Sequence, residues 1–178
     1  RNNMRFIAAD FGAGSGRVIV GTWLAASKTI ELEEIHRFGN EQKMIDGHLR
    51  WDFEALFNEL KTGLKKAFAK YGDEIKSIGI DTWGVDYGLL DKEGRLIANP
   101  ICYRDDRTKG MMDVAFQKLP KEEFFQHAAN QFMEINTAFQ LMSETDLQRA
   151  ERLLFMPDLF NYFLTGKMAT EYTIASTG

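Results

Sequence analysis

A glycine-rich turn between two β-type runs is the feature that most constrains how this chain folds. An apolar run over residues 6–9 ends in Asp10, and three glycines follow within positions 12–16. The next run, Arg17–Leu24, is rich in β-branched residues, so the two runs and their short connection predict a β-hairpin. Glycines allow positive φ and close backbone approach, and successive N–H groups in such a turn can bind an anion. The stretch therefore predicts either a plain tight turn or a phosphate loop, in which a divalent cation would bridge Asp10 and the phosphate.

Two familiar glycine motifs do not fit this turn. A dinucleotide fingerprint needs a helix after its glycines, whereas residues 17–24 favour a strand. A P-loop needs Lys followed by Ser or Thr after its last glycine, and this chain has Arg17-Val18 instead. A phosphate site here would therefore be of the hairpin type, with an acid beside it.

Composition excludes several classes of protein. The chain has 178 residues, enough for one domain of about 150 residues with a real core. Its net charge of −4 gives no general attraction to nucleic acid or to an anionic membrane. No membrane-spanning apolar run or signal peptide is visible, and the single Cys102 fits a reducing compartment, so we expect a cytoplasmic protein. The three histidines, His36, His48 and His127, lack metal-ligand spacing.

The pattern of the first 81 residues predicts a βββαβ core. A third β-rich run, Thr29–Phe38, is followed by a polar loop over residues 39–47. Asp52 suits a helix N-cap, apolar residues recur at three and four through residue 71, and Gly72 suits the helix end. A strand entered after such a helix, here Ile75–Asp81, usually pairs in parallel through a right-handed crossover. Placed beside the first strand, it would bring Asp10 and Asp81 together at an edge where ligands gather in α/β sheets.

The residues after this strand are a second candidate for ligand binding. Asp81 and Asp86 can accept hydrogen bonds from hydroxyl groups, Trp83 offers a flat apolar face, and Gly84 allows close approach. Such a mixture suits a polyhydroxylated ligand. The alternative is the start of a hairpin with a core tryptophan.

The remainder of the chain is predicted to be one hairpin followed mainly by helices. The hairpin covers residues 89–97, and the last segment, Thr170–Gly178, has no helix cap and no closing strand. We therefore expect the chain to be a piece of a longer protein. The predicted helices are residues 108–119, 120–129, 137–146 and 157–164.

Several segments of the chain resemble those of a known family. Residues 9–18 are similar to the first phosphate loop of the FGGY carbohydrate kinases, which belong to the fold group of actin, hexokinase and the heat-shock ATPases. The most specific segment is Asp81–Asp86, which resembles the branch that acts on L-rhamnulose. The other similar segments are Ile35–Phe38, Trp51-Asp52, Ile78–Ile80, Tyr103–Asp105, Met156–Asp158, Leu164–Lys167 and Glu171–Thr173.

The resemblance implies a ribonuclease-H-like ATPase domain with a helical C-terminal portion, of which residues 1–178 are the first, incomplete part. It implies ATP-dependent phosphorylation of L-rhamnulose at its terminal hydroxyl, with Mg²⁺ and with an aspartate general base from a later segment. The implied sites are Ala13, Gly14, Ser15, Gly16 and Arg17 for the nucleotide phosphates, Asp10 for the metal or its waters, and Gly84 for the ketose, with Asp81, Trp83 and Asp86 as neighbours.

Three alternatives remain open from the sequence. The first is another FGGY kinase acting on xylulose, fuculose or glycerol. The second is a two-metal nuclease of the ribonuclease-H-like fold, in which Asp10, Asp81 and either Glu54 or Glu59 hold the metals. Negative net charge and the lack of a basic stripe oppose this alternative. The third is a non-catalytic sensor of sugar or nucleotide. The oligomeric state is open in all three.

Overall fold

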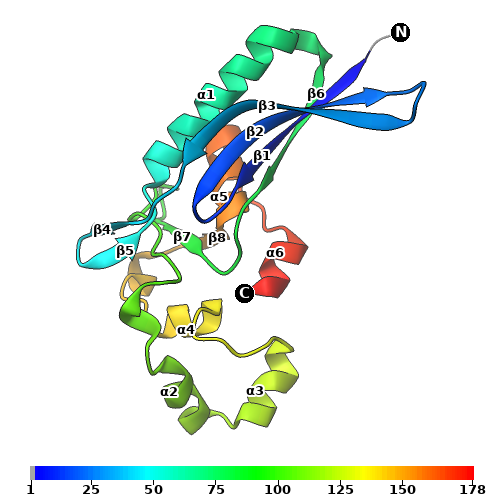
Figure 1. The fold of residues 1–178 in the computed structure, drawn as a ribbon. Coiled ribbons are helices and arrows are strands. Elements are labelled where there is room, and N and C mark those ends of the chain that lie inside the picture. The colour runs from blue at the N-terminus through cyan, green and yellow to red at the C-terminus, as the bar shows by residue number, and fades with distance from the viewer. Residues whose placement is uncertain (1–2) are drawn as a thin grey trace. The chain divides into compact units, whose positions relative to one another are not determined.

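The computed structural model describes residues 3–178, which divide into two compact units (Figure 1). The first unit comprises the chain up to Glu41 together with Asp52–Trp83. The second comprises Gln42–Trp51 and Gly84–Gly178. No helix among residues 3–178 is both long and apolar enough to cross a lipid bilayer.

The first unit is built on a four-stranded mixed sheet, as the sequence predicted. Strand β1 (Met4–Phe11) pairs antiparallel with β2 (Ser15–Leu24), and β2 pairs antiparallel with β3 (Thr29–Gly39). On its other side β1 pairs in parallel with β6 (Ile75–Asp81), which gives the order β3-β2-β1-β6. The predicted βββαβ core is therefore confirmed.

One helix covers one face of this sheet. Helix α1 (Phe53–Tyr71) begins at Asp52, whose side chain accepts a hydrogen bond from Ala55 N, and ends at Gly72. It lies alongside the blue strands in Figure 1 and packs on β1, β2 and β3. Alternate residues of the strands and one stripe of the helix are buried together, which fixes the face that each strand turns to the helix. The buried apolar residues include Ile7, Ala9, Phe11, Val18, Val20, Leu56, Leu60 and Ala67.

The second unit contains two small sheets, and both correct the sequence analysis. The predicted loop over residues 39–47 contains strand β4 (Lys43–Ile45), which forms a hairpin with β5 (His48–Arg50). Strand β7 (Tyr87–Leu90) pairs with β8 (Arg152–Phe155), a strand in the region predicted to be mainly helical. The predicted hairpin partner near residue 96 contributes only an isolated bridge between Leu90 and Leu96.

The helices of the second unit largely follow the prediction, although the helix predicted over residues 137–146 ends at Met142 and one further helix was not predicted. The segment Thr170–Gly178 was expected to have no helix cap, but it contains helix α6 (Tyr172–Thr177). The side chain of Glu171 caps this helix by accepting hydrogen bonds from the amides of Thr173 and Ile174. The remaining helices are α2 (Met111–Lys118), α3 (Lys121–Ala128), α4 (Thr137–Met142) and α5 (Met156–Thr165), and the single 3₁₀ turns are η1 (Gly72–Glu74, in the first unit), η2 (Asp106–Thr108) and η3 (Leu147–Arg149).

Candidate functional site

In the first unit, two acids lie side by side at the ends of adjacent parallel strands. Asp10 at the end of β1 is the register partner of Asp81 at the end of β6. The side chain of Asp10 is 43% exposed, and Asp81 is also exposed. The topology predicted from the sequence thus brings these two residues together. Both carboxylates are accessible at the carboxyl edge of the sheet, where ligands bind in α/β folds.

The glycine-rich hairpin turn is held in shape by a residue that the sequence analysis left in a loop. Gly12 N donates to Ser15 O at 2.9 Å and closes the turn. Asn40, only 3% exposed, binds the turn twice, because its side chain donates to Gly12 O at 2.8 Å and its backbone N donates to Gly14 O at 3.1 Å. Two carbonyl groups of the turn are therefore engaged by Asn40. No sequence pattern indicated Asn40, since its partners lie about 26 to 28 residues away in the chain.

The three glycines of the turn have different structural roles, and none of them adopts the positive φ that glycine allows. A Cβ at Gly12 would lie 2.8 Å from Ser15 O, and one at Gly16 would lie 2.3 Å from the ring of Phe38. Close packing therefore requires glycine at both positions. A Cβ at Gly14 would meet nothing within 4 Å. The fold does not require glycine at position 14. Because Gly14 is exposed and carries no side chain, a ligand can approach its backbone from solvent.

The donors at this turn fit an anion with a divalent cation. Within residues 3–178, the amides of Ala13 and Gly14 donate no hydrogen bond. Arg17 Nε is buried without a hydrogen-bond partner and lies 3.7 Å from the Asp10 carboxylate. Spare backbone amides and a guanidinium group are the donors that bind phosphate, and an adjacent carboxylate suits Mg²⁺. The residues present therefore fit a phosphate group together with Mg²⁺. Ser15 begins β2 and is partly buried.

The described residues do not form the metal site that the nuclease alternative needs. No group of three or more His, Cys, Asp or Glu side chains within residues 3–178 is arranged to hold a metal ion. Glu59 is instead bound to the His36 ring. A two-metal site built on Asp10, Asp81 and an acid of α1 thus has no counterpart here.

The predicted sugar-contacting residues divide between the two units. Asp81 and the partly buried Trp83 end the first unit, whereas Gly84 and Asp86 belong to the second. A Cβ at Gly84 would meet only Thr177, at 3.8 Å, which is ordinary contact, so packing does not require glycine there. Asp86 differs from the expectation of an accessible acid, because it is 0% exposed.

Asp86 lies at the centre of a buried hydrogen-bond network. Its Oδ2 accepts from Trp51 Nε1 at 2.7 Å and from Tyr103 N at 3.2 Å. Its Oδ1 accepts from Nε2 of the fully buried Gln140 at 3.0 Å. Both carboxylate oxygens are therefore used by protein donors, which compensates the cost of burying the charge.

A buried ion pair continues this network. Arg107 Nη1 donates to Glu144 Oε2 at 2.9 Å, and both side chains are almost completely buried. Tyr87 OH also donates to Glu144, and Arg107 Nη2 donates to Gln140 Oε1 at 3.0 Å. Burial alone would raise the pKa of Glu144, but the hydrogen bonds from Arg107 and Tyr87 outweigh it and hold this pKa below its ordinary value of 4.5. Burial raises the pKa of Tyr87, which keeps its hydroxyl protonated as a donor.

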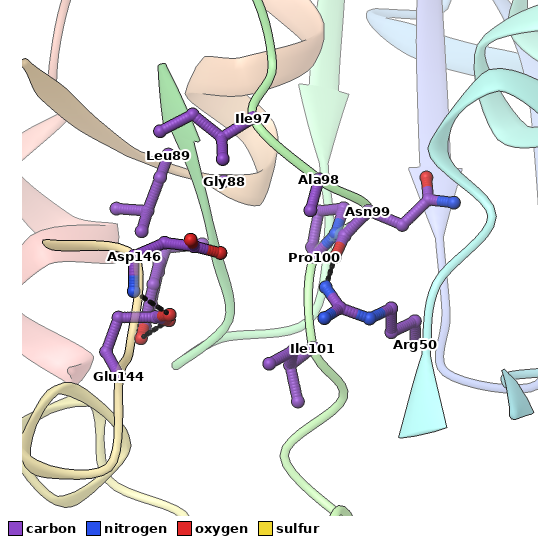
Figure 2. Close-up of a pocket in the computed structure, with 11 residues that line it drawn as sticks. Arg50, Gly88, Leu89, Ile97, Ala98, Asn99, Pro100, Ile101, Glu144 and Asp146 are labelled. Atoms are coloured by element: carbon purple, nitrogen blue, oxygen red, sulfur yellow. Dashed lines mark hydrogen bonds between the residues drawn. The ribbon is translucent and has the colours of Figure 1, made fainter. Parts of the chain in front are cut away.

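Two cavities in the second unit differ in what they can hold. Figure 2 shows the first, of about 20 Å³, whose lining includes Arg50, Asn99 and Glu144; Arg50 Nη1 donates to the backbone oxygen of Asn99 at 2.6 Å. A space of this size holds about one water molecule. The second cavity, of about 240 Å³, is large enough for a small organic molecule, and no motif in the sequence indicated it. Its lining is Phe124, Ala128, Asn130, Phe132, Asn136, Ala138, Phe139, Ala175, Ser176 and Gly178.

The ion pair of Glu144 generates a prediction about pH. Because the pKa of Glu144 is lowered in the folded protein, its carboxylate stabilises the fold above pH 4.5, and this contribution is lost as the pH falls below 4.5. Glu144→Gln should cost about 3 kcal/mol near neutral pH, since it leaves Arg107 buried without its counter-charge. The difference in unfolding free energy between wild type and variant, from urea denaturation, should shrink steadily below that pH. Glu93→Gln, on an exposed glutamate, controls for charge; a difference that stays constant down to about pH 3.5 would contradict the prediction.

Comparisons with known proteins agree with this geometry. Residues 6–178 match the family model described as the FGGY family of carbohydrate kinases, N-terminal domain. A rhamnulokinase of Bacteroides thetaiotaomicron is 45% identical over 177 residues, which are 97% of this chain and 36% of that protein. A rhamnulokinase of Pectobacterium atrosepticum is 44% identical over 176 residues, which are 96% of this chain and 35% of that protein.

A solved structure agrees with the fold. The crystal structure of a ligand-bound xylulose kinase from Lactobacillus acidophilus superimposes with a TM-score of 0.79 at 15% identity, over 97% of this chain and 36% of that one. At such low identity this likeness bears on the fold alone. The chain spans about 36% of the length of the curated relatives it matches. Because the family match covers nearly every residue, the chain belongs to the FGGY family of carbohydrate kinases, and the part of the family that it matches is the N-terminal domain.

Proposed function

We propose that the protein containing this chain is an ATP-dependent carbohydrate kinase that phosphorylates L-rhamnulose. The observation that carries this proposal is the register of β1 and β6, which sets Asp10 beside Asp81 next to a glycine turn with spare amides. Phosphoryl transfer depends on positioning and on neutralising phosphate charge more than on covalent chemistry. A turn with amide donors and an adjacent acid meets that requirement.

The nucleotide is assigned to the first unit. We place its phosphates on residues 13–17, where the amides of Ala13 and Gly14 and the Arg17 guanidinium supply the donors. Asp10 would hold Mg²⁺ or its waters, and the ion would supply charge neutralisation for the phosphates. Arg17, whose Nε lies 3.7 Å from Asp10 Oδ2, would orient that carboxylate.

The ketose is assigned to the segment around Gly84. Glycine there is not needed for packing, so we propose that the sugar approaches the Gly84 backbone, with Asp81 and Trp83 as its neighbours. Asp86 is reassigned, since its buried and fully bonded carboxylate suits positioning rather than sugar contact. The choice of L-rhamnulose is supported by the two rhamnulokinases that are 45% and 44% identical.

A 178-residue chain is short for this activity. We propose that residues 1–178 are the first part of kinase domain I, and that the general base and the rest of the nucleotide site come from other segments, since the curated relatives are about three times as long. The location in a reducing, cytoplasmic compartment stays a prediction from the single Cys102.

Turnover tests the proposed function directly. In a coupled ADP-release assay, the full-length protein should show saturable, Mg²⁺-dependent turnover with L-rhamnulose, and lower kcat/KM with L-fuculose, D-xylulose and glycerol. The 178-residue chain alone should show no measurable turnover, because it lacks the general base. Failure of the full-length protein to use any of the four acceptors would refute the proposed function. A preference for another acceptor would refute the choice of substrate, and turnover by the short chain would refute the domain assignment.

The glycine turn generates a separate prediction. Gly14→Ala should leave the thermal midpoint within about 1 °C, since the added methyl group meets no atom within 4 Å. It should raise KM for ATP about tenfold, because the methyl group would occupy the space needed for phosphate. Gly79→Ala is the matched control, as that position is also open but lies within β6. An unchanged KM for ATP in Gly14→Ala would place the phosphates elsewhere.

A further inference from the structure

The backbone at Val85 is strained, directly after the glycine assigned to the sugar. Val85 has φ of 65°, in the left-handed region that β-branched residues rarely adopt. Asp86 N donates to Gly84 O at 2.9 Å, so Val85 is the central residue of a three-residue turn of the rare, strained hand. Such a conformation persists only where the surroundings impose it, and it is concentrated at ligand sites.

Two buried side chains hold the carbonyl group of this residue. Val85 O accepts a hydrogen bond from Thr137 Oγ1 at 2.8 Å and a longer one from Gln140 Nε2 at 3.4 Å. Gln140 is 0% exposed, and its Nε2 also donates to Asp86 Oδ1 at 3.0 Å and to Ile135 O at 2.9 Å. The side-chain amide of Gln140 therefore links Val85 and Asp86 to the start of α4.

The other side of the turn is fixed as firmly. Asp86 Oδ2 accepts from Trp51 Nε1 and Tyr103 N, and Asp86 O accepts from Met156 N at 3.2 Å. Gln140 is itself held, because its Oε1 accepts from Arg107. These hydrogen bonds to the turn all come from buried or partly buried groups. The turn thus has little freedom to relax toward ordinary φ values.

We propose that Gln140, Thr137 and Asp86 are positioning residues that hold the strained Val85 turn and so present the Gly84 backbone to the ketose. The inference rests on the proposed function for the identity of the ligand. It draws on two independent observations: the strained φ of Val85, and the absence of any packing need for glycine at position 84. A turn that served the fold alone would explain neither.

Removing the amide of Gln140 tests this role. In the full-length protein, Gln140→Met keeps the length of the side chain but removes its hydrogen bonds. It should raise KM for the ketose at least tenfold and leave KM for ATP within twofold. Hydrogen exchange of the Asp86 amide should become faster. The matched control is Tyr162→Phe, which removes a 2.7 Å hydrogen bond to Gly94 O elsewhere in the second unit and should change neither KM.

A milder variant covers the case in which Gln140→Met does not fold. Thr137→Val removes only the hydroxyl donor to Val85 O and should raise KM for the ketose about threefold. In the background of Val85→Gly, which adopts φ of 65° without strain, the same substitution should change that KM less than twofold. Equal effects of Thr137→Val in both backgrounds would overturn the proposal.

The outcomes separate this inference from the proposed function. If wild type shows no turnover with any ketose, the proposed function fails, and hydrogen exchange still decides whether the side chains hold the turn. If wild type is active and Gln140→Met matches Tyr162→Phe in both KM values and in exchange, the side chains are merely structural and the inference is overturned. If Gln140→Met raises only the KM for the ketose and speeds exchange at Asp86, the inference stands.

Discussion

The parallel pairing of β1 with β6 is the constraint on which the rest of the first unit depends. This pairing aligns Asp10 with Asp81 residue for residue, so a shift of one position would turn one carboxylate to the other face of the sheet. The connection that sets it is helix α1, packed so closely on β2 that a Cβ at Gly63 would lie 2.3 Å from a methyl carbon of Val18. The βββαβ connectivity therefore determines the position of helix α1, the order of the strands and the pairing of the two acids.

Local signals explain which parts of the fold could be predicted. The first hairpin and helix α1 have strong sequence signatures: glycine between β-branched runs, and Asp52 and Gly72 at the helix ends. Strand β8 could not be predicted, because its partner β7 lies more than 60 residues earlier in the chain. A strand of only four residues is also too short to show a clear hydrophobic alternation. Helix α6 depends on Glu171, a residue type that is not a preferred N-cap.

The same distinction applies to the candidate site. The placement of Asp10 beside Asp81 could be predicted, because the rule that a strand–helix–strand crossover is right-handed and joins parallel strands was enough to place β6 beside β1. The roles of Asn40 and Gln140 depend on tertiary hydrogen bonds, which no spacing in the sequence reveals. Asp86 was predicted to be an accessible acid beside the sugar, and the sequence could not show that its carboxylate is buried and bonded to Trp51 and Gln140.

In the proposed kinase, one Mg²⁺–polyphosphate group lies against both strand ends of the first unit. The most direct measurement replaces Mg²⁺ with Mn²⁺ in the ADP complex of the full-length protein and records paramagnetic broadening of backbone amide resonances. If the ion lies at this edge of the sheet, the amides of Gly14 and Asp81 broaden strongly together, and the broadening is much reduced in Asp10→Asn. Broadening centred away from both residues, or of one without the other, would contradict it.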